Sequence, residues 1–289
     1  MNEHKSVLLE ESLHFLDIKP GGRYIDATVG AGGHTTKILE EGGEVLGLDQ
    51  DPTSLDLAER RLHACPGKYR LVLANFGKLD AVARETSWDQ PDGILFDLGF
   101  ASFQIDNPER GLSFLREGPL DMRLDPDLGV TAADLVNSLP EKELTKLFQE
   151  YGQEPRARLV ARRIVEERGT KPFTTTTDLA DLVKRLTCNV SRIHPATRVF
   201  QALRIAVNME LENLEEALPK AFELIKSGGR IVVITFHSGE DRIVKHFFER
   251  KEKEGEAKRL TKKPVVPSVE EVKNNPRSRS AKLRVLEKS

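Results

Sequence analysis

Glycine and acidic residues follow two short apolar runs near the start of the chain. Residues 23–29 lead into Gly30-Ala-Gly32-Gly33-His34-Thr35, and residues 44–49 end on Asp49, 19 residues after Gly30. Glycines let a backbone turn sharply and approach a ligand, and a helix N-terminus beyond the turn favours anionic groups. A carboxylate at this spacing can accept hydrogen bonds from both hydroxyls of a ribose. The pattern predicts a nucleotide-like cofactor; the alternative is an ordinary strand-to-helix turn with Asp49 as a helix cap.

A pyrophosphate-binding Gly-x-Gly-x-x-Gly sequence starting at Gly30 would need glycine at position 35, where this chain has Thr35. This argues against an NAD-dependent oxidoreductase, which stays open as an alternative. Asn75-Phe76 and Asp97 end two further apolar runs, and ligands of open parallel sheets bind at the carboxyl ends of the strands. These three side chains are expected to border an adenine or a reacting methyl group, although Phe76 alone could be a core aromatic. Four such strand ends favour a class-I S-adenosylmethionine methyltransferase, whose cofactor has ribose and adenine but no phosphate.

The alternation of apolar runs and helical patterns predicts a doubly wound α/β core, with a parallel sheet covered on both faces. The expected strands are 23–29, 44–49, 69–74, 93–97, 231–236 and 282–286. Helices are expected at 35–41, at 52–63 with Asp51 as the cap before Pro52, and at 241–251. Between them only helical patterns occur, at 132–138, 141–151, 156–168, 178–186 and 196–218. We therefore predict a methyltransferase core at 1–112, an inserted all-helical substrate-recognition domain at 113–213, and the rest of the core with a basic C-terminal segment at 214–289.

Composition excludes several other classes of protein. The 289 residues carry a net charge of −2 and have no apolar run near the ~20 residues of a membrane span, and no signal peptide is visible. We therefore expect a cytoplasmic protein. Cys65 and Cys188 are too few for a disulfide framework, and no residue set has convincing metal spacing, so no required metal is expected. Residues 242–289 hold 15 Lys and Arg against 7 Asp and Glu, which favours a polyanionic partner. The alternative is a solvated loop, for which 251–263 is the best candidate.

Eight short blocks, in order along nearly the whole chain, resemble the bacterial small-subunit ribosomal RNA cytosine-N4 methyltransferases. They are Asp26-Ala-Thr-Val-Gly-Ala-Gly-Gly-His34, Asp49-Gln-Asp-Pro52, Asp97-Leu-Gly99, Arg110-Gly-Leu-Ser-Phe114, Gly118-Pro-Leu-Asp-Met-Arg123, His194-Pro-Ala-Thr-Arg198, Phe236-His-Ser238 with Glu240-Asp-Arg242, and Asn275-Pro-Arg-Ser-Arg279. The chain departs from the family at Phe100-Ala-Ser-Phe-Gln104, where Val-Ser-Ser-Pro-Gln is more frequent, and at Gly239, where Leu is common. These differences put the local loop shape in doubt.

The resemblance implies a class-I core with an inserted helical domain. It implies methylation, by S-adenosyl-L-methionine, of the exocyclic N4 amine of one cytidine in the decoding region of small-subunit ribosomal RNA. The partner would be that RNA or the assembled small subunit, and monomer or dimer is left open. Cofactor contacts carried over from the family fall on Gly32, Gly33, His34, Asp49, Phe76, Asp97 and Gln104.

Methylation of cytosine needs a group that holds the amine, whose lone pair is delocalised into the ring, and that takes its proton. Asp97 is the first candidate, with cofactor positioning as the rival role, and His237 is the second. The alternative for His237 is that Ser238 and Asp241 form a helix capping box that ends a strand there. The family blocks give Asp121, Arg123 and Arg198 as candidates for holding the target nucleotide or closing the site.

Cations of two other segments are candidate RNA contacts. Arg277 and Arg279 have no acidic neighbours in the sequence and are candidate phosphate contacts. The arginine-rich segment 156–168 could contact RNA or form a solvated helix face, and His194 could contact RNA or start a helix. A small-molecule methyltransferase and a non-catalytic RNA-binding protein remain as other functions.

Overall fold

The computed structural model describes residues 6–186 and 194–289, so Cys188 lies outside the described residues. The chain divides into two compact units. The first consists of Met1–Ala101 and Leu211–Ser289, and the second of Ser102–Glu210. The helical unit thus begins at Ser102 where the sequence analysis put residue 113, and it ends at Glu210 where that analysis put residue 213. No helix in the described ranges is long and apolar enough to cross a membrane.

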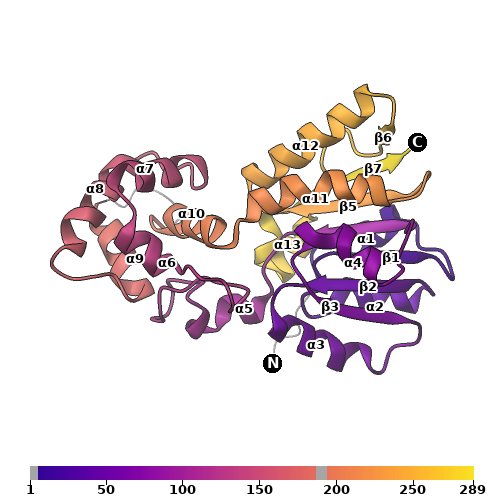
Figure 1. Ribbon diagram of the computed structural model, residues 1–289, viewed down its shortest axis with the longest axis horizontal. Helices are drawn as coiled ribbons and strands as arrows, with labels where there is room; N and C mark the ends of the chain where they lie inside the picture. Colours follow the sequence, from indigo (N-terminus) through magenta and orange to yellow (C-terminus); the bar gives the residue numbers. More distant parts are fainter. Residues whose placement is uncertain (1–5, 187–193) are drawn as a thin grey trace. The chain divides into compact units, whose positions relative to one another are not determined.

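The first unit is built on a seven-stranded sheet of order β3-β2-β1-β4-β5-β7-β6 (Figure 1). Its strands are β1 (Arg23–Asp26), β2 (Glu44–Asp49), β3 (Tyr69–Leu73), β4 (Gly93–Asp97), β5 (Arg230–Thr235), β6 (Ala257–Arg259) and β7 (Lys282–Lys288). Strands β1 to β5 are parallel, as predicted. Strand β7 is antiparallel to both β5 and β6, so the sheet is mixed at this edge. The strand order reverses between β1 and β4, which is where ligands of such sheets bind.

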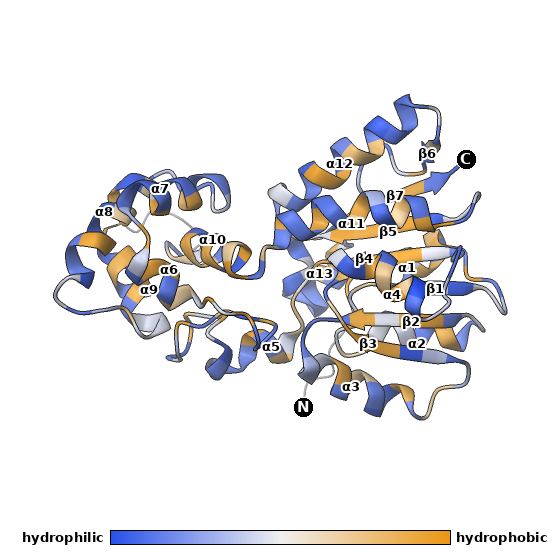
Figure 2. Cartoon of the chain, in the orientation of Figure 1, coloured by the Kyte–Doolittle hydropathy of each residue, from blue (hydrophilic) through white to orange (hydrophobic). Residues whose placement is uncertain are grey.

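Helices cover both faces of this sheet, which confirms the doubly wound α/β prediction (Figure 1). One core layer joins the sheet to α4 (Leu79–Glu85), α11 (Glu210–Leu224) and α12 (Ser238–Lys253). The other joins it to α1 (Leu9–Leu16), α2 (Gly33–Glu40) and α3 (Pro52–Leu62). Neighbouring residues of β4 divide between the two layers: Ile94 and Phe96 enter the first and Leu95 the second. Since side chains alternate along a strand, a strand buried on both faces is apolar throughout, and β2 and β5 are mostly orange in Figure 2.

The second unit is helical and packs around one core of its own. It contains α5 (Ser102–Asp106), η2 (Pro108–Arg110), α6 (Ala132–Ser138), α7 (Glu141–Glu150), α8 (Ala157–Arg168), α9 (Thr176–Arg185) and α10 (Thr197–Asn208). The helix predicted at 196–218 is in fact broken, because Met209 adopts a left-handed conformation with φ 48° between α10 and α11. Arg204 spans the break with two hydrogen bonds to Glu210, of 2.8 and 2.9 Å.

Several segments of the first unit differ from the sequence-based expectation. Helices α1, α4 and α13 (Val269–Asn274) were not predicted, and neither were η1 (Phe76–Lys78) and η3 (Pro276–Ser280). Residues 251–263 were a candidate for a solvated loop, yet they include the end of α12 and the edge strand β6. Arg259 in β6 donates to Glu252 and Glu249 of α12. These ion pairs hold a charged sequence in regular structure.

Candidate functional site

The carboxyl end of β1 holds a buried acid, Asp26. Thr35 Oγ1 of α2 donates to Asp26 Oδ2 at 2.6 Å, and the Thr28 amide donates to Oδ1 at 3.2 Å. Burial raises the pKa of Asp26 to about 6. Thr35 therefore has a structural role at the position where a pyrophosphate site would have glycine.

The carboxyl end of β2 presents Asp49, and each of its carboxylate oxygens accepts a hydrogen bond from a backbone amide. Gly30 N donates to Oδ2 at 2.8 Å and Asp51 N donates to Oδ1 at 2.9 Å. Burial raises the pKa of Asp49 to about 7. The cap of α3 is Asp51, which accepts from Thr53 N as predicted, so the alternative of Asp49 as a helix cap is wrong. Because each carboxylate oxygen has a second lone pair, Asp49 retains acceptor capacity for ligand hydroxyls.

The glycines of this region allow close approach of neighbouring segments. Gly32, the N-cap of α2, has φ 77°, a conformation that favours glycine. A Cβ at Gly33 would collide with the Ser6 hydroxyl. A Cβ at Gly99, after β4, would lie 2.6 Å from a ring carbon of Phe236 after β5. Glycine is thus favoured by its torsion angle at Gly32 and by packing against the Phe236 ring at Gly99.

Asp97 at the end of β4 lies beside His34 of α2, so two residues predicted separately are neighbours. The distance from Asp97 Oδ2 to His34 Nδ1 is 3.7 Å, and Gly99 N donates to Oδ1 at 3.4 Å. Burial, with a further contribution from the negative charge of Asp26, raises the pKa of Asp97 to about 7. A carboxyl group with this pKa can accept a proton near neutral pH.

The end of β3 provides Asn75 and Phe76. Asn75 Nδ2 donates to Gln50 Oε1 at 2.7 Å, and its Oδ1 accepts from Gly77 N, so the amide joins the loops after β2 and β3. The Phe76 ring lies edge-on to Phe96, with centroids 5.9 Å apart, and is partly buried. Phe76 is therefore partly a core aromatic, and its predicted cofactor contact stays a prediction. Gln104 is a buried residue of α5 in the helical unit, and its predicted cofactor contact also stays a prediction.

His237 caps α12, and the predicted capping box of Ser238 and Asp241 is wrong. His237 Nδ1 accepts from Glu240 N at 3.4 Å, and Glu240 accepts in return from His237 N. Asp241 accepts instead from Arg284 Nε of β7 at 2.7 Å, which draws it away from the helix terminus. His237 Nε2 lies 3.1 Å from Glu240 Oε1, but it makes no hydrogen bond within the described residues. The cap therefore uses Nδ1 only, and the predicted contact of His237 with a substrate amine stays a prediction.

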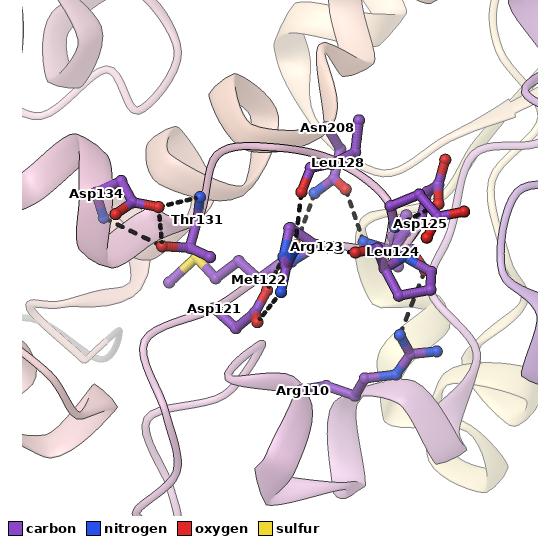
Figure 3. A network of polar contacts seen from close by, with 12 residues as sticks. Arg110, Asp121, Met122, Arg123, Leu124, Asp125, Leu128, Thr131, Asp134 and Asn208 are labelled. Atoms are coloured by element: carbon purple, nitrogen blue, oxygen red, sulfur yellow. Dashed lines mark hydrogen bonds and ion pairs between the residues drawn. The ribbon is translucent and has the colours of Figure 1, made fainter.

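In the helical unit, Asp121 and Arg123 bind each other. Figure 3 shows Arg123 Nε and Nη2 donating to the two carboxylate oxygens of Asp121, each at 2.8 Å. Arg123 Nη1 donates to the carbonyls of Pro126 and Leu128. Because four of the five N–H groups of a guanidinium are engaged in this way, Arg123 closes its own loop. Its predicted contact with a nucleotide would require this network to open.

Asn208, the last residue of α10, fixes the same loop and was missed by the sequence analysis. Its side chain donates to Met122 O at 2.8 Å and accepts from Leu124 N at 2.9 Å (Figure 3). Met122 has φ 68°, a conformation that is uncommon for a residue with a side chain. The only sequence signal was an asparagine inside a helical pattern, where its propensity is low.

Two family blocks meet where His194 stacks on Phe114, with ring centroids 4.5 Å apart and planes 24° apart. His194 Nδ1 also accepts from Ala196 N at 3.2 Å, which agrees with a role at the start of α10. The arginine-rich helix α8 uses Arg162 and Arg163 to bind Glu166, and Arg168 to bind backbone carbonyls of Val136 and Leu139. Much of its charge is thereby engaged inside the unit.

Three predicted RNA contacts are exposed arginines: Arg198 in α10, and Arg277 and Arg279 in η3. Within the described ranges, the side chains of Arg198 and Arg279 make no hydrogen bond or ion pair. These two guanidinium groups can therefore bind an external anion without breaking an internal contact.

Comparison with known proteins shows the family to which this chain belongs. The MraW methylase family matches residues 1–289. The chain belongs to this family. A protein of Carboxydothermus hydrogenoformans named ribosomal RNA small subunit methyltransferase H is 49% identical over 303 residues, covering 99% of this chain and 97% of the relative. A protein of the same name from Thermomicrobium roseum is 49% identical over 304 residues, with 99% and 93% covered. These findings confirm the family predicted from the eight sequence blocks.

A solved rRNA methylase from Streptococcus thermophilus has a TM-score of 0.47 and 12% identity, and the match covers 98% of this chain and 97% of that one. The strand order and the family membership together make the first unit a class-I, Rossmann-like methyltransferase core.

Proposed function

We propose that this protein transfers a methyl group from S-adenosyl-L-methionine to the exocyclic N4 amine of a cytidine in small-subunit ribosomal RNA. Its full-length relatives are named for methylation of that RNA. The observation that carries the proposal is the set of three acids at the strand ends, Asp26, Asp49 and Asp97, whose pKa values are all raised by burial.

This set of acids fits S-adenosylmethionine better than a phosphate-bearing cofactor. Carboxylates held by burial in one region repel the two negative charges of a pyrophosphate, whereas they attract the positive charge of a sulfonium. Thr35, bonded to Asp26, also fills the position of the third phosphate-binding glycine. Asp49 has the acceptor capacity that a ribose with two free hydroxyls requires. The NAD alternative is disfavoured by the same charges.

In the proposed reaction, different residues bind the cofactor and accept the proton. Bound S-adenosylmethionine supplies an electrophilic methyl group. Asp49 holds the ribose hydroxyls, Gly32 and Gly33 allow the backbone to approach, and the Phe76 ring borders the adenine. Ionised Asp97 would accept a hydrogen bond from the cytosine amine. It would take the proton that this nitrogen loses as the nitrogen–carbon bond forms and the carbon–sulfur bond breaks, with the electron pair of the broken bond left on sulfur. Holding the amine in one direction supplies the orientation that such a displacement needs.

RNA recognition is assigned to the helical unit and to the basic C-terminal segment. The free guanidinium of Arg198 and the η3 arginines Arg277 and Arg279 would bind phosphates, which give affinity without base specificity. The target cytidine must leave any stack to reach the strand ends, as base-modifying enzymes require. Following the family resemblance, we place this cytidine in the decoding region, which puts the reaction in the cytoplasm. Asp121 and Arg123 would shape a loop of the helical unit near its RNA contacts.

The test is transfer of a labelled methyl group to small ribosomal subunits that lack the modification, followed by mass spectrometry of the nucleosides. Free small-subunit RNA is assayed in parallel, because the site does not distinguish it from the assembled particle. N4-methylcytidine is expected. Cofactor binding without transfer to either RNA would contradict the proposal, and would favour a small-molecule acceptor or a non-catalytic RNA-binding role.

A further inference from the structure

A threonine hydroxyl stands in for a backbone acceptor at the point where β1 and β4 separate. Ala27 N donates to Leu95 O at 2.9 Å, the last regular bond between these strands. The next bond of a parallel ladder would run from Asp97 N to a carbonyl of the β1 segment. Instead, Asp97 N donates to Thr28 Oγ1 at 2.6 Å. The strand ends can therefore diverge while the amide of Asp97 keeps its partner, as buried amides require.

Thr28 also contacts the second buried acid. Its backbone N donates to Asp26 Oδ1 at 3.2 Å, so one residue binds Asp26 through its amide and Asp97 through its hydroxyl. Thr28 is partly exposed. Among the residues that the structure describes, none accepts the proton of its hydroxyl, which leaves that proton for a ligand or solvent.

The other contacts of Asp97 are weaker than this one. Its carboxylate receives Gly99 N at 3.4 Å and faces His34 at 3.7 Å, both at or beyond the limit of a good hydrogen bond. The Leu98 amide, next along the chain, donates to Ile234 O of β5 at 3.0 Å. Asp97 is thus fixed mainly through its backbone, by Thr28 on the β1 side and by the β5 contact of Leu98 on the other.

We infer that Thr28 is a positioning residue for methyl transfer: its hydroxyl fixes the peptide of Asp97 and so directs the Asp97 carboxylate at the amine. This rests on the proposed function. Without the hydroxyl, the amide of Asp97 loses its acceptor, and the peptide must turn to find another one or water. A change of about 1 Å in the position of a group that orients the reactants can lower the rate by about 100-fold.

The test compares Thr28→Val, which keeps the shape and removes the hydroxyl, with Thr28→Ser, which keeps the hydroxyl. Thr86→Val is the matched control, because Thr86 Oγ1 bonds only helix carbonyls of α4, at Val82 and Ala83. We expect kcat of Thr28→Val to fall by about 100-fold with little change in the KM for the cofactor. Thr28→Ser should stay within about threefold of wild type, and Thr86→Val should match wild type.

Thermal unfolding and equilibrium cofactor binding of each variant separate positioning from loss of structure. If Thr28→Val does not fold, Thr28→Ala removes the same hydroxyl with less bulk, and the same fall in kcat is expected. Full activity of either variant, equal impairment of Thr28→Ser, or a loss confined to cofactor affinity would overturn the inference. An inactive wild type would overturn the proposed function as well, whereas an active wild type beside an unimpaired Thr28→Val overturns the inference alone.

Discussion

Replacing Asp97 with asparagine should make the first unit more stable at alkaline pH. The same change removes the carboxylate that we propose as the proton acceptor. Burial raises the pKa of Asp97 from an ordinary 3.8 to about 7, a shift of about three pH units. At about 1.4 kcal/mol per unit, ionising this group above pH 7 makes the free energy of unfolding about 4 kcal/mol smaller than it would be without the shift. Burying the new amide, whose N–H donors have few partners, offsets about 1 to 3 kcal/mol of this. We expect a net gain of about 1 to 3 kcal/mol at pH 8.

The direction of the stability change follows from the titration of Asp97. Between pH 3.8 and 7 the folded protein holds a proton on Asp97 that the unfolded chain releases. The stability contribution of this group is therefore complete below pH 3.8, falls as the pH rises, and is lost above pH 7. The asparagine variant has no such dependence at this position, so the stability difference between it and wild type should grow from pH 5 to pH 8.

Urea unfolding of the cofactor-free protein at pH 5 and pH 8 measures this difference. Trp88, the only tryptophan of the chain, lies in the core of the same unit, so its fluorescence reports the unfolding of that unit. Asp56→Asn, at an exposed position of α3, is the control and should show no pH-dependent difference. A variant that is less stable than wild type at pH 8, or a difference that is the same at both pH values, would refute the reasoning.

Three further predictions concern the site and the helical unit. Asp49→Asn at pH 8 should weaken cofactor binding by about 10- to 100-fold in calorimetry, because hydrogen bonds to a charged acceptor contribute about 1.5 to 3 kcal/mol; unchanged affinity would remove Asp49 from the site. Arg279→Ala should lower the salt dependence of RNA binding by about one phosphate contact, whereas exposed Arg60→Ala in α3 should not. Asn208→Ala should destabilise the helical unit by about 2 to 4 kcal/mol, seen as faster hydrogen exchange at residues 102–210; unchanged exchange would contradict the assigned network.

The core strands were predictable because local signals agree with the tertiary structure there. The runs at 44–49 and 93–97 coincide with β2 and β4, since each is apolar, buried on both faces and bounded by glycine, proline or charged residues. The break at Met209 was not predictable, because no glycine or proline marks it. It is held by contacts of Asn208 and by the pair of Arg204 with Glu210, and these depend on how the unit packs.

Within the site, residue types were easier to predict than their partners. Asp49 follows from its spacing after Gly30 and Asp97 from its place at a strand end, and the structure places Asp97 beside His34. The helix cap at His237 was missed because local preference favours serine, whereas Arg284, 43 residues beyond Asp241, decides which acid is available to the helix terminus. Thr28 was missed for the same reason, since its partner Asp97 is 69 residues away.

Packing alone does not explain the acids at the ends of these strands. A buried carboxylate with a raised pKa weakens the folded state at neutral pH, and the two presented at the ends of β2 and β4 have pKa values near 7. Packing alone would favour asparagine or an apolar residue at both positions. A cationic ligand reverses this balance, because its charge stabilises the ionised forms that burial disfavours. On the proposed function, the same electrostatics weaken the ligand-free folded state and favour a sulfonium over a pyrophosphate.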